Sequence, residues 1–183
     1  QGVSLTGEEM TQLTAFLREL DATAESFVPD LADSPLSSET IGSTSGSAKI
    51  IPGTDTHYLT NAGSDIYFNA DGFQFAYQRL TGDGEIIARV RMQDAANPWA
   101  KTGVMIRENL TAGSRHALAF TTPAETRNGF GMVWRQAQGG ASGYSAGEAL
   151  NAIPHNWVKL VRSGSVITSF HSGRARSGAR SSS

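Results

Sequence analysis

The chain has 183 residues, and 39% of them are hydrophobic, which suffices for the core of one ordinary domain with an appendage. The formal net charge is −2, so the broad basic surface of a nucleic-acid-binding protein is not expected. The chain has no cysteine, which excludes disulfides, thiolate metal sites and covalent haem attachment within it, and no stretch is long and apolar enough to span a membrane.

Residues 5–20 are predicted to form an amphipathic helix. Thr6 and Glu9 have the spacing of a capping box, and apolar side chains recur at helical spacing along one face. A helix of this length is not stable alone, so that face requires a partner, and we interpret residues 1–21 as the remnant of an upstream domain. The apolar face consists of Met10, Leu13, Phe16, Leu17 and Leu20.

Residues 22–39 contain Pro, Asp and Ser in the pattern of a linker. From residue 40 onward, short β-type segments alternate with Gly-rich turns, and no second helix is predicted. This pattern is typical of an antiparallel sandwich, so residues 40–172 are predicted to form an all-β, two-sheet domain of the jelly-roll or concanavalin A-like type. The expected strands cover residues 47–51, 56–60, 64–68, 73–79, 85–92, 101–108, 115–121, 129–136, 156–162 and 165–170.

Two turns are predicted to join neighbouring strands as hairpins, one over residues 81–84 and one over residues 162–165. In the strands that precede and follow residue 95, apolar side chains alternate with a set that includes Arg89 and Arg107. An antiparallel sheet commonly buries one face only, so we expect the face that bears both arginines to be open to solvent or ligand.

Six phrases carry a family resemblance, and in chain order they are Gly63–Ile66, Asp71–Phe73, Gly82–Val90, Trp99–Glu108, Gly139–Ser142 and Trp157–Arg162. On these phrases, residues 63–170 resemble bacterial concanavalin A-like modules related to the uncharacterised family DUF1349. The resemblance implies a two-sheet sandwich within a large secreted or surface protein, for which sugar binding is supposed from the fold. In place of the family's final strands the chain has an Arg/Ser/Gly-rich tail, so we expect an incomplete sandwich and a disordered or frameshifted segment over 173–183.

The predicted helix carries a second resemblance, in its phrases Leu5-Thr6-Gly7-Glu8-Glu9 and Phe16-Leu17-Arg18-Glu19-Leu20. It is similar to the last helix of small c-type cytochrome domains, which often begins with Leu-Thr and acidic residues and ends Phe-Leu-x-x-Leu. This resemblance implies that a haem domain preceded the present chain.

The sequence does not predict an enzyme. A glucanase of this fold class needs clustered carboxylates, and the nearest pair here is Asp83 and Glu85, of which Asp83 lies in a turn. Ser114 and His116 are close in sequence, but no nucleophile elbow surrounds the serine. The histidines are scattered, so no zinc site is predicted either.

A sugar site would use exposed aromatic rings for stacking and planar polar groups as hydrogen-bond donors. Trp99 follows Pro98 in a loop-like stretch, and Tyr144 lies among glycines, so both are expected at the surface. For each tryptophan the competing interpretation is a place in the core. The candidate ligand-binding residues are Trp99, Arg89, Arg107, Trp134, Arg135 and Tyr144.

Calcium is the one cofactor with candidate ligands, since Asp65, Asn69 and Asp71 cluster ahead of Gly72 and offer oxygen atoms. They do not match the EF-hand pattern, and the preference of Asn and Asp for turns explains the cluster more simply. The prediction is therefore no cofactor, with these residues as weak calcium candidates.

Three functional hypotheses remain open. The first is a non-catalytic carbohydrate- or surface-binding module of a larger secreted bacterial protein, with a polysaccharide or cell-surface glycan as its partner. It would lie outside the cell, at the cell surface or in the periplasm, covalently linked to neighbouring domains. The second is a structural β-sandwich spacer without a ligand, and the third is the tail of a haem-containing redox protein. Glycan binding separates the first from the second, and a Cys-x-x-Cys-His motif upstream would support the third.

Overall fold

The computed structural model describes residues 36–51, 54–94, 96–149 and 156–172, and nearly all regular structure within them is β-strand. Every strand pairing is antiparallel, so the predicted all-β class is confirmed. The one helix in these ranges is a single 3-10 turn at Ala124–Thr126, and none there is long and apolar enough to cross a membrane.

In the described residues thirteen strands form five antiparallel sheets, where two sheets were predicted. The two shortest strands, β4 and β5, have two residues each and flank one tight turn. In chain order the strands are β1 Ser37–Ile41, β2 Gly46–Ile50, β3 His57–Asn61, β4 Ile66–Tyr67, β5 Ala70–Asp71, β6 Phe73–Tyr77, β7 Gly84–Val90, β8 Thr102–Arg107, β9 His116–Thr121, β10 Phe130–Arg135, β11 Ser142–Ala146, β12 Asn156–Ser163 and β13 Val166–Ser172.

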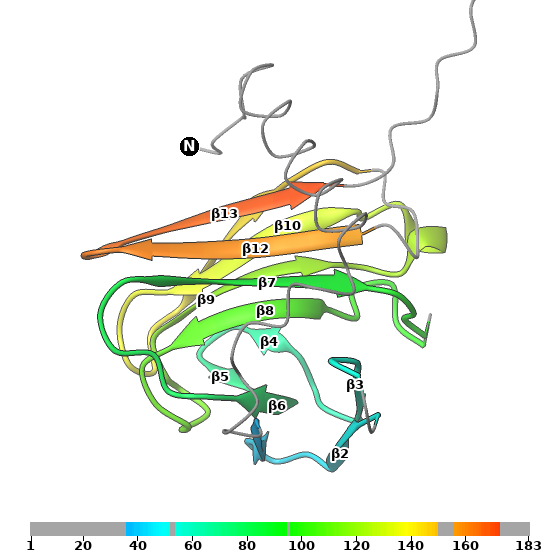
Figure 1. The fold of residues 1–183 in the computed structure, drawn as a ribbon, viewed down its shortest axis with the longest axis horizontal. Helices are drawn as coiled ribbons and strands as arrows, with labels where there is room; N and C mark the ends of the chain where they lie inside the picture. The colour runs from blue at the N-terminus through cyan, green and yellow to red at the C-terminus, as the bar shows by residue number, and fades with distance from the viewer. Residues whose placement is uncertain (1–35, 52–53, 95, 150–155, 173–183) are drawn as a thin grey trace, which may run out of the picture.

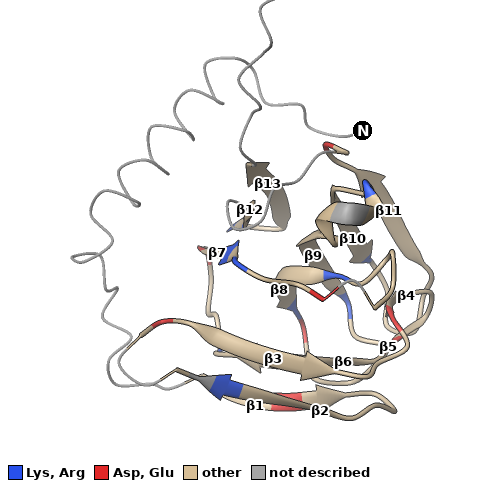
Figure 2. Ribbon diagram, turned by 90° about the vertical axis from the view of Figure 1, so that its right-hand side faces the viewer, with Lys and Arg blue, Asp and Glu red and all other residues tan. Residues whose placement is uncertain are grey.

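A four-stranded sheet in the order β11–β10–β9–β8 lies in the middle of the molecule (Figure 1). The sheet β13–β12–β7 covers one face of it and the pair β1–β6 covers the other, as the turned view in Figure 2 shows. The hairpin β2–β3 contacts β6 in turn. The described strands therefore form three layers, and the middle sheet belongs to two cores.

Strand β9 shows why the middle sheet needs a cover on both faces. All six of its residues are buried. Phe120 packs with Phe73 in the core on the β1–β6 side, whereas Ala119 packs with Leu160 in the core on the β12 side. Since consecutive residues of a strand point to opposite faces, a strand buried at every position requires both faces to be covered. The small alanine side chain lets β12 approach β9 closely.

One of the two predicted hairpins is correct and the other is wrong. The turn at 162–165 joins β12 to β13, with Gly164 at a φ of +58°. The turn at 81–84 does not join paired strands, because β6 pairs with β1 and β7 pairs with β12. Between β6 and β7 the chain crosses from one layer to another, and the Asp83 carboxylate accepts a hydrogen bond from the Gly164 backbone N–H at 2.6 Å.

Each of the ten predicted strands overlaps an observed one, and the strands that the sequence did not predict are β1, β5 and β11. Strand β1 corrects the predicted linker over 22–39, because residues 37–39 pair with β6. The pattern failed there since Ser37, Ser38 and Glu39 are exposed and carry no apolar alternation. The predicted helix at 5–20 and the predicted tail at 173–183 lie outside the described residues.

The two cores predict a marked difference between two aliphatic truncations. Leu160→Ala removes a buried side chain between β12 and the middle sheet, and it should lower the free energy of unfolding by about 2–5 kcal/mol. Val166→Ala truncates an exposed side chain on β13 and should change it by less than about 0.5 kcal/mol. Urea unfolding of both variants checks this, and equal losses would contradict the assignment of the core.

Candidate functional site

A carboxylate and a guanidinium group meet in the interior between the middle sheet and the β4–β5 turn. Arg135, at the end of β10, donates from Nη2 to Asp71 Oδ1 at 2.6 Å and from Nη1 to Asp71 Oδ2 at 3.0 Å. Both side chains are fully buried. The two-pronged geometry matches the planar guanidinium to the carboxylate, which makes this pair the strongest polar contact among the described residues.

Arg135 also organises the backbone around it. Its remaining N–H groups donate to carbonyl oxygens and to one hydroxyl, at distances between 3.0 Å and 3.3 Å. A buried charge is tolerated only when its donors are satisfied, and these contacts satisfy them. The acceptors are the carbonyl oxygens of Tyr67, Phe68, Ala112, Ser114 and Gly140 and the Ser142 hydroxyl. Arg135 was predicted to contact a ligand, and its burial shows that this prediction is wrong.

Arg107 was predicted on an open face of its sheet, and this prediction is wrong as well. Its side chain is 2% exposed, and its guanidinium lies 5.2 Å and 5.9 Å from the ring centroids of Phe73 and Phe75. The cause is the pair β1–β6, which covers the face that the alternation pattern left open. The weakly hydrated guanidinium can lie against aromatic rings, and Asp71, 3.5 Å away, balances its charge.

His116 completes this buried ion cluster, which consists of Asp71, Arg107, His116 and Arg135. Its Nδ1 lies 3.2 Å from the Ser114 carbonyl oxygen and 3.6 Å from Asp71 Oδ2. Its Nε2 is buried and has no hydrogen-bond partner among the described residues. Burial lowers the pKa of His116, with Asp71 opposing that effect, so the neutral imidazole is favoured.

The serine and the two carboxylates that the sequence offers for catalysis form hydrogen bonds or ion pairs within the fold. The Ser114 hydroxyl donates to the Arg115 carbonyl oxygen at 2.9 Å and accepts from the Asn109 backbone N–H at 3.1 Å. Glu85 forms an ion pair with Lys159 at 2.8 Å, and Asp83 holds the β12–β13 turn.

Two exposed aromatic rings, one from the segment before β8 and one from β11, lie side by side. Trp99 is 46% exposed and Tyr144, on β11, is 37% exposed. Their ring centroids are 6.1 Å apart, in an edge-to-face arrangement. The structure thus brings together two of the six predicted ligand-binding residues, from segments that are distant in sequence.

Lys101, whose side chain is only 6% exposed, and the half-buried Tyr67 lie next to these rings. The Lys101 ammonium group lies 6.0 Å from the Tyr67 ring centroid, and the Trp99 carbonyl oxygen accepts a bond from it at 3.4 Å. The same ammonium group lies 5.6 Å from the Phe120 ring centroid, and the Tyr144 ring packs against Phe120 with centroids 6.3 Å apart, so Lys101 links Tyr67 to Tyr144. Burial raises the pKa of the Tyr144 phenol, and the Tyr67 phenol raises it further. We call Trp99, Tyr144, Tyr67 and Lys101 the aromatic patch.

A glycine forms the base of the patch. A Cβ atom on Gly131 would lie 2.7 Å from the Phe120 ring and 3.0 Å from the Tyr144 ring. The two rings, with centroids 6.3 Å apart, therefore rest directly on the backbone of β10. This close approach, rather than any turn geometry, is what requires glycine at that position.

The weak calcium candidates do not form an open site. Asp65 Oδ1 accepts from Lys101 Nζ at 2.5 Å and from the Ile66 backbone N–H at 2.7 Å, so an ammonium group already neutralises it. Asp71 is held by Arg135, and Asn69 lies in the β4–β5 turn. In the part of the chain that the structure describes, no three metal-ligating side chains gather.

Trp134 and Arg89, the other two predicted ligand-binding residues, lie apart from the patch. Trp134 is on the opposite face of β10 from Arg135, and its ring rests on Gly143, where a Cβ atom would lie 2.5 Å from it. Arg89 lies on the outer face of β7, as predicted, with its guanidinium 5.5 Å from the Trp157 ring centroid.

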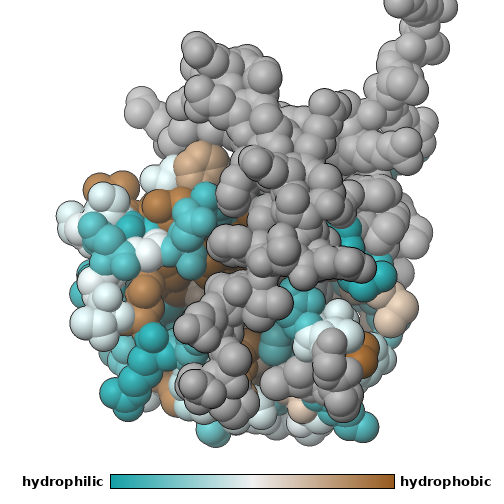
Figure 3. Space-filling model, in the orientation of Figure 1, coloured by the Kyte–Doolittle hydropathy of each residue, from teal (hydrophilic) through white to brown (hydrophobic). Residues whose placement is uncertain are grey.

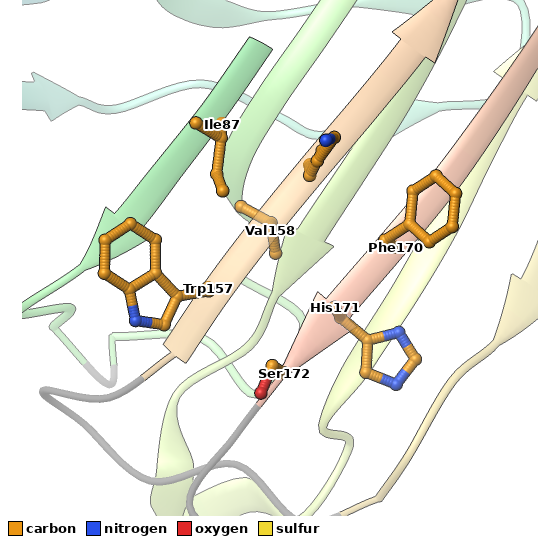
Figure 4. Close-up of a pocket in the computed structure, with 7 residues that line it drawn as sticks. Ile87, Trp157, Val158, Phe170, His171 and Ser172 are labelled. Carbon is orange, nitrogen blue, oxygen red and sulfur yellow. The ribbon is translucent and has the colours of Figure 1, made fainter. Parts of the chain in front are cut away.

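A second feature of the surface is a shallow depression on the sheet β7–β12–β13. Figure 4 shows Trp157, Ile87 and Phe170 around it, with His171 and Ser172 from β13 at one side. Its lining is largely apolar, and the Lys159 ammonium group in it is paired with Glu85. It lacks the convergent polar groups that orient a bound small molecule, so the aromatic patch is the better candidate.

The Phe68 backbone departs from ordinary geometry. Its φ of +46° lies in the left-handed region, which costs a bulky residue about 1–3 kcal/mol. The carbonyl oxygen of Phe68 accepts from the Ser142 hydroxyl at 2.8 Å and from Arg135 Nη2 at 3.3 Å. These bonds hold the turn in its conformation. Phe68 is not among the residues expected from the sequence to contact a ligand. Its position beside Asn69, between two short β-type segments, is the signal that indicates a turn there.

Comparisons with known protein families, with curated proteins and with solved structures found no match to this chain.

The buried ion cluster predicts a strong effect of removing one partner. Asp71→Ala leaves the Arg135 charge buried without its counter-ion and should lower the free energy of unfolding by about 3–5 kcal/mol. The double variant Asp71→Ala with Arg135→Met removes both charges and should recover part of that loss. Chemical unfolding of the three proteins checks this; a double variant less stable than the single one would contradict it.

Two histidines predict how stability depends on pH. Burial lowers the pKa of His116 and of His171, whose Nε2 accepts from the Glu148 backbone N–H. Below the unfolded-state value of about 6.5 the unfolded chain binds more protons, so these groups should make stability fall as the pH drops from 7.5 to 5. Urea unfolding across this range should show a smaller fall in His116→Asn and in His171→Asn, and unchanged slopes would contradict the assignment.

Proposed function

We propose that the chain is a non-catalytic carbohydrate-binding module whose site is the aromatic patch. The observation that carries the proposal is the pairing of Trp99 with Tyr144, two exposed rings whose centroids are 6.1 Å apart. Isolated exposed aromatic side chains are common, but a contiguous group built on a rigid sheet is typical of a binding surface.

The chemistry of the patch suits a sugar. Aromatic rings offer flat apolar surfaces on which the C–H faces of a sugar ring can stack, and the phenol groups of Tyr67 and Tyr144 can both donate and accept hydrogen bonds. The Lys101 ammonium group is paired with Asp65, so the patch presents little net charge. A neutral polyhydroxylated ligand therefore fits better than an anionic one.

We also propose that the module is not a catalyst, because its acidic side chains near the patch are bound by basic ones. Glycoside hydrolysis requires two carboxyl groups that are free to act on one bond. The carboxylates nearest the patch, Asp65 and Asp71, are bound by Lys101 and Arg135. Neither is available as a nucleophile or as a proton donor.

We further propose that the fold is a variant of the concanavalin A-like sandwich, related to DUF1349, and that the module belongs to a protein acting outside the cell or at its surface. The support is the set of matching phrases together with the antiparallel layers that they form. Trp99 and Lys101 come from the longest of these phrases, which contains all of β8. Because loops and sheet faces determine where a ligand binds on such a module, the fold alone does not locate the site, and the residues of the patch do.

Binding to insoluble cellulose, xylan and chitin tests the proposal. Trp99→Ala and Tyr144→Ala should each weaken binding to the recognised polysaccharide by about tenfold or more, because each removes a central stacking surface. Tyr58→Ala is the matched control, since Tyr58 is 47% exposed on β3, in a hairpin that contacts β6 and β1. Binding should persist in the presence of EDTA.

Two outcomes would contradict this proposal. Equal effects of the Tyr58 and Tyr144 variants would show non-specific adsorption through exposed aromatic rings. A failure of the unmodified protein to bind any of the three polysaccharides, or a wider array of neutral glycans, would favour a structural spacer instead.

A further inference from the structure

The aromatic surface continues beyond Tyr67 to an exposed phenylalanine. The ring centroids of Tyr67 and Phe68 are 5.1 Å apart, in an edge-to-face arrangement, and Phe68 is 69% exposed. Tyr67 in turn lies next to Lys101, which contacts the Trp99 carbonyl oxygen. Aromatic side chains therefore follow one another from Trp99 through Tyr144 and Tyr67 to Phe68.

Strand β11 fixes both ends of this row. Ser142 and Tyr144 are two residues apart on β11, so their side chains lie on the same face of the sheet. The Ser142 hydroxyl donates to the Phe68 carbonyl oxygen at 2.8 Å, while Tyr144 carries the contact with Trp99. The position of Phe68 relative to Trp99 is thus set by one rigid strand rather than by a free loop.

The geometry of Phe68 cannot be explained by packing. A glycine or an asparagine would adopt its positive φ at lower cost. Burial does not compensate for the strain either, because most of the side chain is in contact with solvent. The buried Arg135 and the half-buried Ser142 hold the carbonyl oxygen in place and so keep the ring presented outward. Strain that the surroundings impose on an exposed aromatic residue points to a function of that residue.

We infer that Phe68 is a distal subsite of the aromatic patch, and that the ligand is an extended neutral polysaccharide chain bound along the row Trp99–Tyr144–Tyr67–Phe68. This inference rests on the proposed function and specifies its ligand. Several linked sugar units can each stack on a different ring of this row, whereas a single sugar cannot contact Trp99 and Phe68 at the same time. The pairing of Lys101 with Asp65 in the middle of the row favours a chain without charged groups.

Chain length provides the experiment. Calorimetric titration of the disaccharides and hexasaccharides of cellulose, xylan and chitin should show tighter binding of the hexasaccharide by the unmodified protein. Phe68→Gly should weaken hexasaccharide binding by about tenfold and leave disaccharide binding unchanged, because only the longer ligand reaches that ring. Ser142→Ala, which removes the hydroxyl that holds the Phe68 carbonyl oxygen, should have the same selectivity with a smaller effect.

Stability separates this role from a packing role. Because glycine relieves the left-handed strain, Phe68→Gly should unfold at the same temperature as the unmodified protein or at a higher one. A lower midpoint would show that Phe68 serves the fold, and would overturn the inference.

The remaining outcomes distinguish the inference from the proposal beneath it. If Trp99→Ala abolishes hexasaccharide binding while Phe68→Gly does not change it, the site ends at Tyr144; the inference then fails and the proposed function stands. If the unmodified protein binds no oligosaccharide of either length, both fail together.

Discussion

Arg135 and Asp71 form an ion pair that excludes water, and the layers around it depend on that contact. Asp71 belongs to the short strand β5 and Arg135 is the last residue of the inner strand β10, so their pairing fixes the β4–β5 turn, which buries little apolar surface of its own. Removing two charges from water is expensive, and the pair is tolerable because the carbonyl oxygens around Arg135 accept its remaining protons. The same contacts determine where three separate loops must lie.

The buried ion cluster supports the aromatic patch through hydrogen bonds to the backbone beneath it. Arg135 bonds to the carbonyl oxygens of Tyr67, whose side chain is half-buried, and of Phe68, whose side chain is exposed. The side chains that would meet a ligand are therefore positioned by a charged group that never contacts it. Because these hydrogen bonds already fix the backbone that carries the rings, less conformational entropy is lost when a ligand binds.

Local patterns in the sequence predicted the strands well, because alternation and turn residues act over a few positions. They predicted the pairing of β12 with β13 but not the partner of β7, and the turn after β6 shows why: Gly82 and Asp83 fit a hairpin, yet the partner of β7 is β12. The face of Arg107 was mistaken for a similar reason. An arginine in an alternating strand suggests solvent, and only the tertiary arrangement supplies Phe73 and Asp71 to cover it.

The candidate site was predictable in part. Trp99 and Tyr144 were expected at the surface from the proline and glycines beside them, and the structure brings them together. Trp134 was included because residue type alone does not reveal the face of a strand. The ion cluster was not foreseen, since Asp71 and Arg135 are 64 residues apart and nothing local marks either as a partner of the other.

The crossing between β6 and β7 has a consequence for how the chain folds. Six of the eight described pairings join consecutive strands and can form from local segments, but β1–β6 and β7–β12 join strands that are distant in the chain. The contact between Asp83 and Gly164, which accompanies the β7–β12 pairing, joins residues that are 81 positions apart. Loop closure over such distances costs entropy before the contacts compensate for it, so the topology favours slow folding through a late, concerted assembly. Until the layers assemble, β7 and β12 expose unpaired backbone edges. These edges can pair with other unfolded chains, so aggregation competes with folding less in dilute solution.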